Sequence, residues 1–419
     1  MKNTLTILLF FINVGLISPQ IVLNIEGTDL VFDETGNSNG VNIPRSEPTI
    51  LTYRNNSITA VNSGGYMLQA GDEGPRPSNN NLDGEVIIGN RFVWNGTEQT
   101  SWTHALFTGY NLGVIIKYNY LQSTPNGIQR KSNGMYETSG VVAYNILNNP
   151  KLGVAVKGIN GIKIYNNTFY SERTPIQTNR GLVDICNNTD GELNSIASGT
   201  KIYNNIFYTR NKVFNIRILE PDCLKDFESD YNVFWCEAGD PIFEVNNETK
   251  NFTQWQALGY DLHSIVINPE FTDLTNFVPK VRLDYGMDLG PDLINGLAID
   301  GFWGKLDPRV VSQNGTWQVG ARIYEEEEEV EIPDNKLRIY PNPAEDFLII
   351  EMNDPDSVYQ YMKLYDPKGR LLLTHSLNEG RNEIPIQFYS SHGLYIVAFE
   401  ADNLNRLITK LLLFVQEYF

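Results

Sequence analysis

Cysteine and histidine are scarce in this sequence, which has 3 cysteines and 4 histidines among 419 residues. Neither type shows the close spacing that is typical of a zinc site, so we expect no metal centre of that kind. The sequence also lacks a glycine-rich phosphate loop and any sign of a serine or cysteine nucleophile. The cofactor therefore stays open, and calcium is the ion that we keep in view.

Basic residues are outnumbered by acidic ones. The 32 lysines and arginines stand against 50 aspartates and glutamates, which gives a net charge of −18 and an isoelectric point near 4.7. Nucleic-acid binding begins with a basic surface, so we expect no nucleic-acid partner. An acidic polysaccharide would need a local basic patch on this protein.

Long apolar runs are missing after the first residues. The run from Leu5 to Ile17 follows Met1-Lys2 and is followed by Ser18. It predicts a signal peptide over residues 1–20, because the run is too short to span a membrane comfortably and no basic residues follow it. Export would permit a disulfide between Cys223 and Cys236 that leaves Cys186 free, and three unpaired cysteines are the alternative.

What the chain does contain is a repeat. Apolar, aromatic-rich segments recur, each closing on an asparagine, at Asn90, Asn119, Asn145, Asn167, Asn205 and Asn232. The steps are 29, 26, 22, 38 and 27 residues, which fit a coil of three short strands. A β-propeller would need four strands and a longer period in each repeat.

These repeats resemble the right-handed parallel β-helix of the pectate-lyase-like superfamily. The resemblance covers about 250 residues and implies an all-β fold over residues 21–323, with a cap at its C-terminal end. The asparagine column fits a ladder of amides at a tight bend. Members of the superfamily often bind or cleave long polysaccharides along one flat face, so an extracellular polysaccharide is the implied partner.

The last part of the chain is different. Residues 324–334 hold five consecutive glutamates, Glu325–Glu329, and predict an acidic linker, because like charges extend the backbone. Residues 335–419 show short alternating strands separated by turns, which is typical of a small β-sandwich. Tyr340-Pro-Asn-Pro-Ala344, Leu364-Tyr-Asp-Pro-Lys-Gly-Arg370 and Gly393-Leu-Tyr-Ile-Val397 resemble the C-terminal sorting domain of type IX secretion. The resemblance implies export by that machinery, and a secreted or outer-membrane cell-surface protein of a Gram-negative bacterium.

A second strand of each coil can be aligned. Gly127-Ile-Gln-Arg-Lys131 and Gly153-Val-Ala-Val-Lys157 lie 26 residues apart, the same step as from Asn119 to Asn145. The constant register predicts that Lys131 and Lys157 stack about 4.8 Å apart on neighbouring coils. Two amines at that spacing repel unless an anion lies between them.

Alternation along these strands predicts which side chains enter the core. Ile128, Val154, Val156 and Phe107 are expected to point inward, and Thr108 to share the column of Lys131. Arg130 then falls on the inward side as well. Either the strand ends before it, or Arg130 pairs with a carboxylate such as Glu137.

A β-elimination site needs a base and a cation that neutralises a uronate carboxylate. Lys131 or Tyr136 is our candidate base, Lys157 or Arg130 the candidate cation, and His104 lies nearby in sequence. A hydrolase would instead pair two carboxylates across coils, and the sequence singles out no pair among Glu137, Asp184, Asp190, Glu228 and Asp230. The motifs of pectate lyases and polygalacturonases are incomplete.

Two functions therefore stay open. One is lyase-like cleavage of a uronate-containing glycan by an expected monomer, and the other is a non-catalytic glycan-binding adhesin or surface scaffold. A groove with converging acidic and basic side chains would favour catalysis. A flat face of Asn, Thr and Tyr would favour binding.

Overall fold

The computed structural model describes residues 8–12, 20–36, 41–43, 49–63, 66–70, 85–96, 104–109, 113–132, 139–176, 179–189, 195–299, 308–325, 337–340, 347–352, 359–366, 370–386, 393–401 and 406–413. The chain divides into two compact units, Met1–Glu326 and Glu327–Phe419. The division falls inside the run of glutamates.

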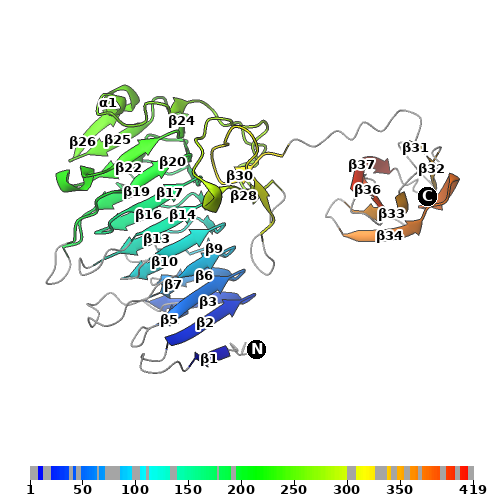
Figure 1. Ribbon diagram of the computed structural model, residues 1–419, viewed down its shortest axis with the longest axis horizontal. Coiled ribbons are helices and arrows are strands. Elements are labelled where there is room, and N and C mark those ends of the chain that lie inside the picture. The colour runs from blue at the N-terminus through cyan, green and yellow to red at the C-terminus, as the bar shows by residue number, and fades with distance from the viewer. Residues whose placement is uncertain are drawn as a thin grey trace. The chain divides into compact units, whose positions relative to one another are not determined.

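Unit 1 is a parallel β-helix made of three nine-stranded sheets (Figure 1). Sheet A is formed by β1 (Leu8–Ile12), β2 (Gln20–Glu26), β5 (Thr49–Arg54), β8 (Val86–Ile88), β11 (Val114–Lys117), β14 (Gly140–Ala143), β17 (Ile162–Tyr165), β20 (Lys201–Tyr203) and β23 (Glu228–Asp230). Every neighbouring pair from β2 to β23 is parallel, and β1 is antiparallel to β2. The signal peptide over residues 1–20 stays a prediction.

Sheet B follows sheet A in each coil. Its strands are β3 (Asp29–Gly36), β6 (Ser57–Ser63), β9 (Arg91–Trp94), β12 (Tyr120–Gln122), β15 (Ile146–Asn148), β18 (Thr168–Ser171), β21 (Ile206–Thr209), β24 (Val233–Cys236) and β27 (Ile265–Val266). One residue pattern runs through it: Phe169, Phe207 and Phe234 stack inside the coil with ring centroids 4.8 and 5.1 Å apart. Stacked rings at this spacing fill the core between consecutive coils.

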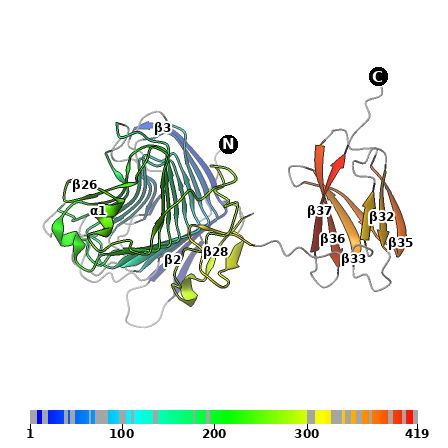
Figure 2. The same cartoon turned by 90° about the horizontal axis from the view of Figure 1, so that it is seen from above.

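Sheet C closes each coil. Its strands are β4 (Val41–Ile43), β7 (Tyr66–Ala70), β10 (His104–Gly109), β13 (Asn126–Lys131), β16 (Leu152–Lys157), β19 (Gly181–Cys186), β22 (Phe214–Ile218), β25 (Ile242–Val245) and β26 (Glu248–Asn251). The last strand, β26, is antiparallel to β25 and leads into α1 (Phe252–Gln256), which Asn251 caps. Figure 2 shows the solenoid from this end. The predicted all-β parallel solenoid is confirmed.

The bend between sheets A and B carries an asparagine ladder. Asn56, Asn90, Asn119, Asn145, Asn167, Asn205 and Asn232 are all buried, and each amide Nδ2 donates to the Oδ1 of the next at 2.9–3.0 Å. The residue before each one has a positive φ, for example 55° at Tyr144, which the tight bend requires. The predicted ladder therefore exists, and Asn56 extends it by one coil.

A strap of residues 268–299 and 308–325 returns along the outside of the solenoid. It contains η2 (Pro291–Leu293), β28 (Asn295–Ala298), β29 (Val310–Ser312) and β30 (Arg322–Ile323). Apolar side chains of the strap pack on tyrosines and aliphatic residues that sheet B turns outward. The Tyr118 and Tyr144 hydroxyls donate to the carbonyls of Asn295 and Leu293, at 2.6 and 2.5 Å. The strap thus covers much of the outer face of sheet B.

Unit 2 is a small antiparallel sandwich, as predicted. One sheet has β31 (Leu337–Tyr340), β32 (Phe347–Met352) and β35 (Gly380–Pro385), and the other has β33 (Tyr359–Tyr365), β34 (Leu371–Ser376), β36 (Gly393–Ala401) and β37 (Arg406–Leu413). Its separate core includes Leu348, Ile350, Leu364, Val397 and Phe399. This core makes unit 2 a domain with its own packing.

Candidate functional site

The outer face of sheet C carries two columns of side chains that the register defines. One runs Gln69, Phe107, Gln129, Ala155, Asp184, Arg217 and Glu244, and the second runs Gly109, Lys131, Lys157 and Cys186. Leu106, Ile128, Val154 and Val183 alternate with the first column and form the core. The outer face of sheet C therefore carries two of the five predicted site residues, Lys131 and Lys157.

Lys131 and Lys157 are direct neighbours across β13 and β16, as predicted. Lys131 is 6% exposed and Lys157 is half-buried, so Lys157 presents the more accessible amine. Gly109, and not Thr108, continues their column, because Thr108 pairs with Arg130. The expectation that Phe107 points inward is also wrong, since Phe107 pairs with Gln129 in the outward column.

Arg130 points into the coil, in the column of Val156 and Ile185. It is fully buried, and its guanidinium donates to Thr108 Oγ1 at 2.6 Å and to the Ser139 carbonyl at 3.3 Å. Burial lowers the pKa of Arg130 to about 9, so the group stays charged at neutral pH. Its place in the core separates it from any ligand on the outer face, and the suggested partner Glu137 lies outside the described residues.

Of the other two predicted site residues, His104 does not join the lysines. His104 begins β10, five residues before the Gly109 position that lines up with Lys131. At about 3.3 Å per residue this places His104 roughly 16 Å along the strand from the lysine column. His104 is 5% exposed and packs on the Tyr66 ring at 5.2 Å. Tyr136 lies outside the described part of the chain.

Next to the lysines lies a charged cluster that the sequence did not single out. Arg217 of β22 sits between two carboxylates: its Nη1 is 3.3 Å from Asp184 Oδ2, and its Nη2 is 2.8 Å from Glu244 Oε1. Arg180 Nη1 also lies 3.8 Å from Asp184. Since all three central side chains are 3–11% exposed, this is a nearly buried ion-pair network.

Asp184 is the most perturbed carboxyl of this cluster. Burial raises its pKa to about 6, and Arg217 and the Gly181 N–H, which donates to Oδ1 at 2.6 Å, act in the opposite direction. A carboxyl that titrates near pH 6 can exchange a proton under mild conditions. Asp184 was among the carboxylates considered from the sequence, whereas Arg217 and Glu244 were not.

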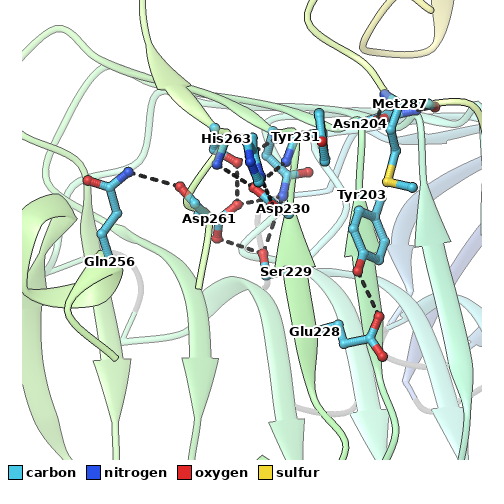
Figure 3. A network of polar contacts seen from close by, with 12 residues as sticks. Tyr203, Asn204, Glu228, Ser229, Asp230, Tyr231, Gln256, Asp261, His263 and Met287 are labelled. Atoms are coloured by element: carbon cyan, nitrogen blue, oxygen red, sulfur yellow. Dashed lines mark hydrogen bonds and ion pairs between the residues drawn. The ribbon is translucent and has the colours of Figure 1, made fainter. Parts of the chain in front are cut away.

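A second polar cluster ends the asparagine ladder (Figure 3). Asp261 replaces the next asparagine: its Oδ1 accepts from Asn232 Nδ2 at 2.8 Å, and its Oδ2 accepts from Ser229 Oγ and Trp255 Nε1 at 2.6 Å. Burial raises the pKa of Asp261, and these donors oppose the shift. The cluster satisfies the last amide of the ladder where the coil ends.

Two carboxylates of β23 face outward beside this cluster (Figure 3). Asp230 Oδ2 lies 2.6 Å from Nδ1 of the exposed His263, whose ring stacks on Tyr231. Glu228 accepts from Tyr203 Oη at 2.7 Å and pairs with Lys201 at 2.8 Å. Each of these two carboxylates is therefore bound to its own partners, and they form no hydrolase pair with each other. Glu137 and Asp190 lie outside the described residues.

Neither a metal centre nor a membrane span is found in the described residues. They contain no group of three or more His, Cys, Asp or Glu side chains that could hold a metal ion. They also contain no helix long and apolar enough to cross a membrane.

Comparison with known proteins bears on the tail. Residues 338–413 match the family model described as secretion system C-terminal sorting domain. No curated protein and no solved structure matches the chain. The sorting tail makes this a secreted or cell-surface protein that interacts with the type IX secretion machinery.

Proposed function

We propose that the solenoid binds an acidic extracellular polysaccharide along the outer face of sheet C. The observation that carries the proposal is the register of β13 and β16, which places Lys131 and Lys157 side by side on that face. Two neighbouring positive charges attract the carboxylate or sulfate groups of a polyanion. The proposal concerns binding, because the predicted catalytic set is divided between the core, the outer face and the far end of the strand.

Charge distribution supports this choice of face. The outward positions of the sheet C strands β13, β16, β19, β22 and β25 carry Lys131, Lys157 and Arg217 against Asp184 and Glu244. Their net charge is +1 (3 − 2), whereas the whole chain has −18. Arg217 pairs with both carboxylates, and Lys131 and Lys157 add two further positive charges to this face. The outer face of sheet B is a poorer choice, because the strap packs on it.

The test is a binding screen with the full chain. Gel retardation in the presence of polyuronates and sulfated glycans should slow its migration, and a neutral glucan should not. The retardation should weaken as salt rises, because exposed charges are screened. Equal migration in all gels would remove the proposal.

A second candidate is cleavage by β-elimination, which the same lysine pair favours. Lys131 would take the proton from the carbon next to the uronate carboxylate while Lys157 neutralises that carboxylate. The glycosidic C–O bond breaks, a C=C bond forms, and the leaving oxygen takes up a proton. Absorbance of the unsaturated product is the readout. Binding without product, or product formation that survives both Lys131→Ala and Lys157→Ala, would leave recognition alone.

A further inference from the structure

The chain has its three cysteines at two different bends of the solenoid. Cys186 ends β19, and Cys223 lies in η1 (Pro221–Leu224), so both occupy the bend from sheet C to sheet A, on consecutive coils. Cys236 ends β24, at the bend from sheet B to sheet C. The topology therefore disfavours the expected Cys223–Cys236 pair and brings Cys186 and Cys223 together. All three thiols are free in the structure.

Contacts at this bend join the two cysteine-bearing segments. The Leu219 N–H donates to the Ile185 carbonyl at 3.0 Å, and the Asn187 N–H donates to Glu220 Oε2 at 2.9 Å. Cys223 Sγ lies 3.3 Å from Oδ1 of Asn187, the residue directly after Cys186. The register pairs Ile185 with Ile218, which places Leu219 opposite Cys186. Cys223 lies four residues further on, in η1, and its contact with Asn187 brings it back to this bend.

We propose that Cys186 and Cys223 form a disulfide once the protein leaves the cytoplasm. The sorting tail shows that the protein is exported, and extracytoplasmic compartments permit disulfides. Two S–H bonds break and one S–S bond forms. Two electrons and two protons pass to the active-site disulfide of an extracytoplasmic thiol oxidase, which becomes a dithiol.

The surroundings of the two thiols slow their oxidation once the protein has folded. Burial raises the pKa of both Cys186 and Cys223 to about 12, and the charges of Asp184 and Glu220 add to the effect on Cys186. Thiolates are the reactive form, so spontaneous oxidation at neutral pH is slow. Because Cys186 pairs with Lys157 in register, the disulfide would anchor the bend beside the outer face of sheet C.

The full chain, exported to an oxidising compartment, is denatured and alkylated with iodoacetamide before and after reduction. We expect one alkylated cysteine, Cys236, before reduction and three after it. Peptide mapping should recover a Cys186–Cys223 crosslink. Reduction should lower Tm by about 5 °C, since the crosslink restricts the unfolded chain.

Matched variants locate the bond. Cys236→Ser should keep the crosslink and leave no cysteine to alkylate before reduction. Cys186→Ser should expose two cysteines, Cys223 and Cys236. Three alkylated cysteines in the unreduced exported wild type, or a crosslink that contains Cys236, would overturn the proposal, and neither result depends on a variant.

Discussion

The ladder bend and the outer face of sheet C handle polar groups in opposite ways. At the ladder bend one residue type repeats and each amide is bonded to the next, as Asn145 Nδ2 is to Asn167 Oδ1 at 3.0 Å. On the outer face of sheet C the side chains change from coil to coil, and charges meet in a network around Arg217. A residue type that repeats in every coil serves the folding of every coil. Side chains that differ from coil to coil serve a role that only a few coils have.

Removing one asparagine of the ladder should have the largest effect on stability. Asn145→Ala deletes the donor to the Ile116 carbonyl, the donor to Asn167 and the acceptor for Asn119. Several buried groups then lose their partners, so we expect a loss of about 4 kcal/mol in the free energy of unfolding. Denaturant unfolding of the isolated solenoid unit measures it. Asn268→Ala, at an exposed position, removes only an exposed acceptor of the Glu270 N–H and should cost about 1 kcal/mol at most. Equal losses would refute the structural role of the ladder.

The second largest loss of stability is expected in the ion-pair network around Arg217. Arg217→Met removes the guanidinium between Asp184 and Glu244 and leaves only the more distant Arg180 beside Asp184, which we expect to cost about 3 kcal/mol. Adding Asp184→Asn should restore part of the loss, because the uncompensated buried charge is removed. A double variant less stable than Arg217→Met would show that the two side chains are not coupled in this way.

The contribution of Asp184 can be measured from the pH dependence of stability. Its pKa is about 6 in the folded protein and about 3.9 in an unfolded chain, so the folded state binds the proton more tightly. The stability that this group contributes is therefore present below pH 4 and is lost as pH rises to 6 and above. From pH 4 to pH 7.5 the wild type should lose about 2 kcal/mol more than Asp184→Asn. Parallel stability curves would contradict the assignment.

A smaller effect is expected where the strap meets the ladder bend. Tyr118→Phe removes the donor to the Asn295 carbonyl and should cost about 1 kcal/mol. Hydrogen exchange over β28 (Asn295–Ala298) should accelerate, while exchange over β13 should not. Unchanged exchange in β28 would show that apolar packing alone holds the strap.

The sequence was sufficient for the periodic features. The ladder and the Lys131–Lys157 register could be predicted because step lengths of 26 residues agreed for two independent columns. The Asp184–Arg217–Glu244 network could not, because the 38-residue step from Asn167 to Asn205 interrupts the alignment just where Asp184 lies. The signal available was a charged residue between apolar ones in each of β19, β22 and β25.

The expectation that Phe107 points inward failed for a local reason. Phe107 is apolar and fully buried, yet it belongs to the outward column, so hydrophobicity alone assigned it to the wrong face. Arg130 shows the reverse, a charged residue that the alternation rule correctly placed inside. The choice between inside and outside is made by register with neighbouring coils, which one strand by itself does not reveal.

Charge reversal at one lysine tests the central claim, that the outer face of sheet C binds an acidic polysaccharide. Lys157→Glu lies on that face, and Lys163→Glu makes the same change on an exposed position of sheet A. Affinity of the full chain for a retarding polyuronate should fall at least about tenfold for Lys157→Glu and stay within about twofold for Lys163→Glu. Equal affinities for the two variants, or a loss confined to Lys163→Glu, would contradict the account.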